Sequence, residues 1–492
     1  MTPSTAIAFS IGLPLFGAVL IVLQDRYPNI REAITLITAA CLLLVVLTIL
    51  PAVNAGGRPG FVAFEMVPGI PMAFEAEPLG MLFALVASGL WLVTSCYSIG
   101  YMRSNNEHKQ TRFYACFAVA LSSTMGLCFA ANMLTLFIFY EVLTLSTYPL
   151  VTHSETREAM VAGRTYLGIL IGTSIGLLLL GMIWTWSTTG TLDFKPGGIL
   201  KGKADGPVVG LLLFLYMFGI GKAALMPIHR WLPAAMVAPT PVSALLHAVA
   251  VVKAGVFTVV KVIVYIFGVD LLSKTAEAGW LIYIAGATIL IASVIALRQD
   301  NLKRRLAYST VSQLSYVIIA AAILTPISIM AAALHIAAHA VGKITLFFAA
   351  GSVYTAAHKT EISQMNGIGR RMPWTMTAFG IASLSMIGLP ATAGFLSKWY
   401  MLQGAAQTNQ WFPLVVIVLS TLLNAAYFLP IVYAAFLKPE DPPEAGHHAD
   451  DHGEASPWIV GALTLTAAGS VVLFWVPGPA YDLAHQLMGA VR

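Results

Sequence analysis

The feature that most constrains this chain is a succession of apolar stretches, each long enough to cross a lipid bilayer as a helix. A helix needs about 20 mainly apolar residues to span the hydrocarbon core, and fourteen stretches of the sequence meet that requirement. They lie near residues 5–23, 31–50, 79–101, 112–130, 132–152, 160–187, 208–237, 241–266, 279–298, 308–324, 327–356, 373–405, 411–437 and 456–477. The runs are continuous instead of alternating, which excludes a membrane β-barrel. The sequence therefore predicts an all-α polytopic membrane protein.

The composition supports the same class. Hydrophobic residues make up 58% of the 492 residues and charged residues 10%, with a mean hydropathy of +0.80. Soluble domains carry about 25% charged residues, so soluble enzymes, nucleic-acid-binding proteins and disordered proteins are excluded. The four cysteines lie in apolar runs without Cys-x-x-Cys spacing, which argues against a disulfide framework, a zinc site or an iron–sulfur cluster. Residues 51–78 are rich in Gly and Pro and are expected to form an outer loop.

The positive charges of the loops predict the orientation. Loops after odd-numbered spans contain sixteen Lys and Arg residues, whereas loops after even-numbered spans and the C-terminal end contain six. Cytoplasmic loops carry the excess of Lys and Arg in membrane proteins. We therefore expect a multi-pass protein of the cell (inner) membrane with both termini on the outer face.

Several ionisable side chains fall inside the expected spans. They are Glu141, Lys222, His247, Lys253, Lys261, His335, His339, Lys343 and Lys398. A Lys at the bilayer centre costs about 2.5–3.5 kcal/mol on the insertion scale, so these groups must be paired, hydrated or close to a span end. Lys261 is within two turns of its span end and is expected to reach the interface by snorkelling, as Lys398 could also do. For Glu141, Lys222 and Lys253, a purely structural ion pair is the alternative to an ion pathway.

One span carries a polar stripe. His335, His339 and Lys343 are spaced at i, i+4 and i+8, so they drift by only about 40° per step along one helix face. Such a stripe on an otherwise apolar helix indicates a path for water or protons. The alternative is that both histidines bond to neighbouring backbone carbonyls.

Two spans contain helix breakers beside a lysine. Pro227 and Pro233 follow Lys222, and the segment GLPATAG (388–394) precedes Lys398. Proline lacks a backbone donor and interrupts a helix. Broken helices at corresponding places in two halves of a chain are typical of the binding site of a repeat-built transporter.

Five segments together resemble one known family. They are FYEVLTLSTYPL (139–150), GKAALMPIHRWLPAAMVAPTPVSALLHAVAVVKAGVF (221–257), DNLKRRLAYSTVSQLSY (300–316), HAVGKITLFF (339–348) and GLPATAGFLSKWY (388–400). They are similar to the proton-translocating antiporter-like subunits of respiratory complex I, Mrp-type cation/proton antiporters and membrane-bound hydrogenases. The chain departs from the family at Ala234, where an acidic residue is usual.

The resemblance implies a fold of about 14 transmembrane helices with two inverted five-helix repeats and two broken helices. The expected divisions are residues 1–111 for helices 1–3, 112–266 for the first repeat (helices 4–8), 279–437 for the second repeat (helices 9–13), and 456–492 for helix 14. It also implies roles for seven residues. Glu141 and Lys222 would form the interacting pair, Lys253 the central relay, His335 or His339 with Lys343 its continuation, and Lys398 the terminal group.

The resemblance favours one function and leaves others open. A Lys at position 398 resembles the D-type Mrp subunits and one complex I subunit. The leading hypothesis is a proton-translocating subunit of a multi-subunit Na⁺/proton antiporter. Such a protein would be an ion transporter without a cofactor or resident metal. The alternative is a proton-pumping subunit of complex I or an energy-converting hydrogenase, and a stand-alone transporter is a third hypothesis. Expected partners are other subunits of the complex, protons, Na⁺ and the bilayer, with no nucleic acid.

One polar tract lies near the C-terminal end. The segment EDPPEAGHHADDHGEA (440–455) contains His447, His448, Asp450, Asp451 and His452. Clustered His and Asp residues are able to bind a metal. We expect a solvated acidic linker instead, because nothing else in the sequence indicates a metal site.

Overall fold

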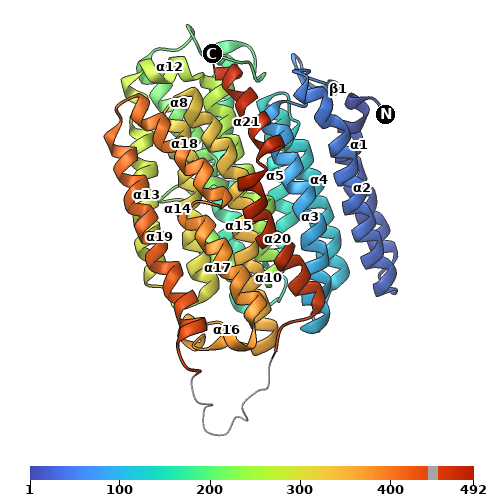
Figure 1. Ribbon diagram of the computed structural model, residues 1–492. Coiled ribbons are helices and arrows are strands. Elements are labelled where there is room, and N and C mark those ends of the chain that lie inside the picture. Colours follow the sequence, from blue (N-terminus) through green and yellow to red (C-terminus); the bar gives the residue numbers. More distant parts are fainter. Residues whose placement is uncertain (441–452, 492) are drawn as a thin grey trace.

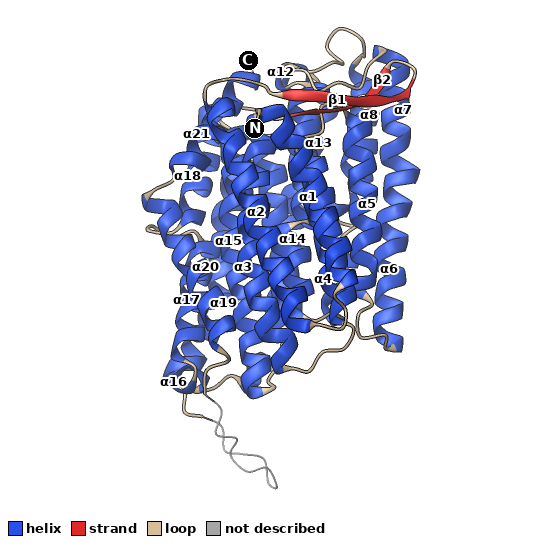
Figure 2. Ribbon diagram, turned by 90° about the vertical axis from the view of Figure 1, so that its right-hand side faces the viewer, coloured by secondary structure: helices blue, strands red, loops and turns tan. Residues whose placement is uncertain are grey.

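The computed structural model describes residues 1–440 and 453–491, and they form a bundle of long, roughly parallel helices (Figure 1). One end, the hairpin face, carries strands β1 (Gly60–Val67) and β2 (Ile70–Glu75). The other end, the α16 face, carries the short helix α16 (Ile368–Arg371) (Figure 2). Both labelled chain ends lie at the hairpin face (Figure 1). The histidines and aspartates of the 440–455 tract lie outside the described residues.

Ten helical stretches of the described chain are long and apolar enough to cross a membrane. Six of them are α1 (Pro3–Leu23), α2 (Pro28–Asn54), α3 (Pro78–Ser104), α5 (Met133–Val151), α15 (Pro326–Ala357) and α19 (Trp411–Leu437). The others are α20 (Pro457–Trp475), the stretch Arg157–Thr189 containing α6 (Arg157–Thr173) and α7 (Leu179–Thr189), the stretch Thr240–Phe267, and the stretch Ala276–Leu297 with α13 (Trp280–Leu297). The prediction of an all-α polytopic membrane protein is confirmed.

The other four expected spans coincide with helices that are more polar or interrupted. They are α4 (Gln110–Cys128), α8 (Gly206–Gly219), α14 (Leu302–Ala322), and the pair α17 (Pro373–Ile387) and α18 (Ala393–Gln407). The count of about fourteen crossing helices stays a prediction, as do the inverted repeats.

The two helix breaks expected from the sequence are present. After α8, the chain forms only a short turn, η2 (Gly221–Ala223), before helix α9 (Trp231–Ala234). Between α17 and α18, Gly388 adopts a left-handed conformation with φ +88°, which glycine accepts at little cost. Lys222 lies within the first break, and Lys398 lies in the first turns of α18 beyond the second.

Two neighbouring helices occupy the centre of the bundle. The first extends from Thr240 to Phe267 with a bend at Ala250, and it comprises α10 (Thr240–Ala244), η4 (Leu245–Val249), α11 (Val251–Lys261) and η5 (Val262–Phe267). In its most apolar 18-residue stretch 100% of the residues are buried, and in the corresponding stretch of α15 94% are buried. Because α11 and α15 pack against each other, their polar residues face protein instead of lipid. Both η4 and η5 are π-helical, a distortion frequent at functional sites.

The structure differs from expectation at two places. The 51–78 segment contains the antiparallel β1–β2 hairpin. The sequence predicted a loop there because the segment is rich in Gly and Pro. The C-terminal span is followed by a separate helix, α21 (Gly478–Val491), because Pro477 and Gly478 end α20. Helix α21 buries Leu483 and Leu487 and packs against α3 and α15. A short helix, α12 (Val269–Lys274), also lies at the hairpin face (Figure 1).

Candidate functional site

Lys222 is held by α5 at the first helix break. Its ammonium donates hydrogen bonds to the carbonyl oxygen of Tyr140 (2.8 Å) and to the hydroxyl of Thr144 (2.5 Å). Its backbone N–H donates to the phenol oxygen of Tyr140 (3.1 Å). The side chain is completely buried. The break therefore exposes a backbone donor and turns the lysine toward the neighbouring helix.

Glu141 lies next to this contact on α5 without forming an ion pair. Both carboxylate oxygens are buried, and neither has a hydrogen-bond partner among the described residues. The charge of Lys222 acts on the Glu141 carboxylate, yet no ion pair within 4.0 Å joins these two residues in the described chain. The pair expected from the sequence is thus adjacent and open in this conformation.

Lys253 lies at the middle of the central helix and contacts His339. Its ammonium nitrogen is a hydrogen-bond neighbour of Nδ1 of His339, and both residues are completely buried. Gly255 brings α11 against the first break, because a Cβ at this position would lie 2.3 Å from the backbone carbon of Lys222. The close packing of Gly255 therefore joins the Lys222 break to the helix that carries Lys253.

His335 continues the line from His339 along α15. The two imidazole rings are nearly parallel, with centroids 6.0 Å apart. Nδ1 of His335 lies 2.8 Å from the hydroxyl of Ser397, and Nε2 lies 3.0 Å from Oε1 of Gln313. Both partners are side chains, so the alternative of histidines bonded to backbone carbonyls does not describe His335. Ser397 precedes Lys398 in the chain, so this contact reaches the second break.

Lys398 is buried at the second break, where it closes the end of α17. Its ammonium donates to the carbonyl oxygens of Met386 (2.9 Å) and Ile387 (2.8 Å). These carbonyls end α17 and lack helical partners there, because a helix leaves its last carbonyls free. The side chain of Lys398 is 4% exposed, which contradicts the snorkelling alternative for this residue.

Lys343 points away from this line. It donates to the hydroxyl of Ser309 (2.8 Å) and to the carbonyl oxygen of Leu306 (3.3 Å), and the phenol of Tyr427 also bonds to Ser309 (3.2 Å). The stripe of three residues on α15 thus divides. His339 and His335 lie between Lys253 and the second break, whereas Lys343 forms a branch toward α14 and α19. We call Lys222, Lys253, His339, His335 and Lys398 the relay.

The structure also places groups that the sequence reasoning did not assign. His247 is completely buried on η4, and both of its ring nitrogens lack a partner in the part of the chain that is described. Its charged neighbours include Lys253 and Lys343. In the sequence, the signal that could have singled out His247 was its position within an expected span. Gln313 and Ser397 are further polar residues of spans whose roles depend on the packing between helices.

Lys261 is not at the interface, so the snorkelling prediction was wrong. It is 1% exposed, and its ammonium donates to the carbonyl oxygen of Ala130 (2.8 Å) and lies 3.5 Å from Oε1 of Glu77. Phe194 covers it, with the nitrogen 4.4 Å from the ring centroid. Snorkelling needs a helix end open to water, and here neighbouring segments close that end.

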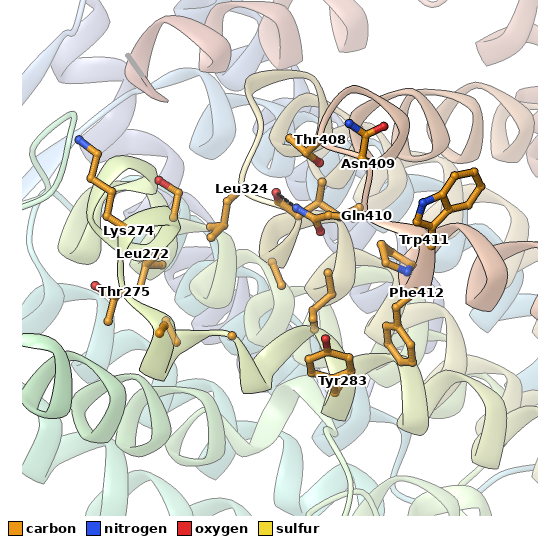
Figure 3. Close-up of a pocket in the computed structure, with 18 residues that line it drawn as sticks. Leu272, Lys274, Thr275, Tyr283, Leu324, Thr408, Asn409, Gln410, Trp411 and Phe412 are labelled. Atoms are coloured by element: carbon orange, nitrogen blue, oxygen red, sulfur yellow. Dashed lines mark hydrogen bonds between the residues drawn. The ribbon is translucent and has the colours of Figure 1, made fainter.

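A pocket at the hairpin face is separate from the relay. Figure 3 shows this pocket of about 740 Å³, lined by residues at the ends of α12, α14 and α18. Across it, the side-chain amide of Gln410 donates to the carbonyl oxygen of Ile323 (3.1 Å). Its described lining residues include none of the relay. We therefore assign the pocket no part in the titratable line.

Comparison with known proteins identifies the family. Residues 130–424 match the family described as NADH:quinone oxidoreductase/Mrp antiporter, transmembrane region. The chain belongs to this family. The matched region contains the whole relay together with Glu141 and Lys343.

Two curated relatives indicate the breadth of the family. The chain is 36% identical over 369 residues to NADH-quinone oxidoreductase subunit N of Desulforudis audaxviator, a match that covers 74% of this chain and 72% of the relative. It is 28% identical over 447 residues to a probable K(+)/H(+) antiporter component of Rhizobium meliloti, covering 88% of this chain but only 43% of the relative. This family member therefore resembles proteins of two kinds of complex.

Two solved structures share the fold over almost the entire chain. A chain of the Mrp complex from Dietzia sp. has a TM-score of 0.88 at 20% identity and covers 100% of this chain and 98% of its own. A chain of the membrane-bound sulfane sulfur reductase, an archaeal respiratory membrane complex, has a TM-score of 0.85 at 24% identity and covers 99% and 98%. At these identities the likeness concerns the fold alone.

Proposed function

We propose that this chain conducts protons across the membrane as one subunit of a multi-subunit complex. The observation that carries the proposal is the continuous line of buried titratable groups from Lys253 through His339 and His335 to the neighbourhood of Lys398. Bare hydrocarbon offers a proton no partner, and ionisable residues inside a membrane protein mark ion paths. An imidazole is suited to such a path, because it can accept a proton on one nitrogen and release one from the other.

The open contact between Glu141 and Lys222 is the control element of the proposed path. When the pair closes, the carboxylate of Glu141 offsets the charge of Lys222, whose backbone packs against the helix that carries Lys253. When it opens, as here, Lys222 bonds to Tyr140 and Thr144 instead. The two arrangements place a different charge beside α11, so pair formation would be coupled to proton binding at Lys253.

For the complex, we propose a monovalent cation/proton antiporter, with Na⁺ as the exchanged cation. The 28% identity to a probable K(+)/H(+) antiporter subunit supports the antiporter assignment. The second candidate is a proton-pumping subunit of a respiratory complex, which the 36% identity to a subunit N favours. The two candidates differ in the partner subunits and in the energy source, whereas the path through this chain is the same in both.

For the orientation, we propose that the α16 face is cytoplasmic in the cell membrane. The loops with the larger share of Lys and Arg lie at the end opposite the hairpin, and cytoplasmic loops carry this excess. Both termini would then lie on the outer face, together with the β1–β2 hairpin.

Dye-reported proton flux in everted membrane vesicles containing the complete complex tests the path. We expect Lys253→Ala to abolish flux while the complex still assembles, and wild-type flux in this variant would contradict the proposal. Purification in mild detergent then separates the two candidates: small antiporter subunits support the first, and subunits with iron–sulfur or nickel centres support the second.

A further inference from the structure

A buried cluster beneath the hairpin is not used by the relay. Glu77 precedes α3 and accepts hydrogen bonds from the backbone N–H groups of Leu79 (2.9 Å) and Gly80 (2.8 Å) and from the phenol of Tyr265 (3.0 Å). Its carboxylate lies 3.5 Å from the ammonium of Lys261. Glu77, Lys261 and Tyr265 are 5%, 1% and 4% exposed. An acid, a base and a phenol thus meet at the hairpin end of the central helix.

The cluster lies on the same helix as the centre of the relay. Lys261 follows Lys253 by eight residues, a distance of about 12 Å along the axis at 1.5 Å per residue. The helix runs from the α16 face to the hairpin face, so Lys261 lies between Lys253 and the hairpin. A proton moving from Lys253 toward that face would meet this cluster.

Glu75 extends the cluster toward the protein surface at the hairpin face. It is the last residue of β2 and is only partly exposed. Four charged residues surround it: Lys261, Glu77, Arg58 and Asp193. Burial raises the pKa of Glu75 above the ordinary value for a glutamate, and the charge of Lys261 opposes this effect. A carboxyl group with a raised pKa is closer to the proton affinity at which binding and release both occur near neutral pH.

A purely structural pair would not need this arrangement. Buried ion pairs are weak contributors to stability compared with apolar residues of the same volume. The ammonium of Lys261 has three donors and uses one of them for the carbonyl of Ala130 (2.8 Å). It is therefore able to shift between the Ala130 carbonyl and the Glu77 carboxylate without leaving its place.

We propose that Glu75, Glu77, Lys261 and Tyr265 form the opening through which protons pass between Lys253 and the hairpin face. Lys261 is the counter-ion of Glu77, Tyr265 and Glu77 supply oxygen atoms along the passage, and Glu75 exchanges the proton with water. The proposal rests on the proposed function and deepens it, since it assigns the outer end of the same path.

Glu75 is the residue that tests the opening, because it does not cap a helix as Glu77 does. In vesicles containing the complete complex, we expect Glu75→Gln to reduce flux by about a hundredfold or more, the lower end of what a positioned proton-transfer group contributes. Glu75→Asp keeps a carboxyl group and should retain most of the flux and its pH profile. Glu65→Gln is the matched control: Glu65 is an exposed acid of the same hairpin that accepts a bond from the Gly69 N–H (2.7 Å), and its loss should leave flux unchanged.

The outcomes separate this proposal from the proposed function. Wild-type flux in Glu75→Gln overturns the opening, as does an equal loss in Glu75→Gln and Glu75→Asp, which would indicate packing and not proton exchange. Lys253→Ala is measured in parallel. Normal flux in Lys253→Ala refutes the proposed function itself, whereas lost flux there with normal flux in Glu75→Gln refutes the opening alone.

Discussion

Lys253 and His339 join the two most deeply buried helices of the bundle through a direct contact between the ammonium and Nδ1 of the imidazole. The other ring nitrogen of His339 is buried and has no partner among residues 1–440 and 453–491. The parallel ring of His335 lies next along α15, with its centroid 6.0 Å away. A histidine with one nitrogen engaged and one free is placed to pass a proton onward. The proposed path therefore continues from Lys253 and His339 to His335 and the second helix break.

The order Lys253, His339, His335 predicts different effects for two residues of the polar stripe on α15. His335→Leu should abolish flux, because it removes the group that contacts Ser397 and Gln313. Lys343→Met should retain a measurable part of the flux, since Lys343 bonds to Ser309 on a branch. Vesicle flux at equal amounts of assembled complex compares them. Complete loss in Lys343→Met with normal flux in His335→Leu would reverse the order.

A second prediction concerns the packing between the first break and the central helix. Gly255→Ala should lower the stability of the complex by about 1–3 kcal/mol, the usual cost of overpacking a core, because its Cβ would meet the Lys222 backbone at 2.3 Å. Thermal unfolding of the purified complex measures this change. The control is Gly172→Ala on α6, where a Cβ meets nothing within 4 Å, and equal stability of the two variants would contradict the argument.

Much of the fold follows from the sequence, because it depends on local patterns. The apolar runs predict the helices, and the prolines and glycines near Lys222 and Lys398 predict both breaks. The contacts of the candidate site depend instead on how separate helices align, which no single stretch encodes. The spacing of His335, His339 and Lys343 indicates one face of α15, but only the position of α14 and α19 decides that Lys343 branches away.

Lys261 illustrates the same limit. Its distance from the span end suggests snorkelling, and only the packing of Ala130 and Phe194 over that end excludes it. The available signal was Glu77, an acid directly before the third expected span (79–101) that could supply a counter-ion. Pairing of the two could not be deduced, because they are far apart in the sequence.

The buried pair gives a third prediction. Lys261→Leu should destabilise the complex by about 3–5 kcal/mol, because it leaves the buried carboxylate of Glu77 without its counter-ion. The melting temperature of the complex in detergent is the measurement. Adding Glu77→Gln to Lys261→Leu should recover part of the loss, since the amide carries no charge and its oxygen can still accept one of the two backbone bonds of α3. A Lys261→Leu complex as stable as wild type would restore the snorkelling interpretation.

A fourth prediction concerns pH and the loop after α5 at the α16 face. His153 is buried there, and burial together with the charge of Arg112 lowers its pKa to about 4 from 6.5. The charged groups near it are Arg112, His108 and Glu155, and Glu107, with Oε2 at 3.8 Å. Between pH 6.5 and 4 the unfolded chain binds a proton at this position and the folded chain does not. Stability is thus complete above pH 6.5 and falls as the pH drops through this window, by up to about 3 kcal/mol.

Thermal unfolding of the complex between pH 4 and 7 checks this pH dependence. In His153→Phe, an aromatic ring still packs near Phe113 but no proton is bound, so the decline below pH 6.5 should be shallower than in the wild type. The same slope in both proteins would assign the pH dependence to other groups.

The last prediction separates a structural role of Lys398 from proton transfer. Lys398 donates to the free carbonyls of Met386 and Ile387 at the end of α17, so a lysine that only closed this helix end would be replaceable by another cationic donor. Lys398→Arg supplies such a donor, but a guanidinium does not release its proton in proteins. We expect the Arg variant to assemble at wild-type levels and to lose flux. Lys398→Ala should lose flux and also stability, because two buried carbonyls lose their donor. Vesicle flux and melting temperature are measured together for both variants. Wild-type flux in Lys398→Arg would limit Lys398 to closing the end of α17 and would end the relay at His335.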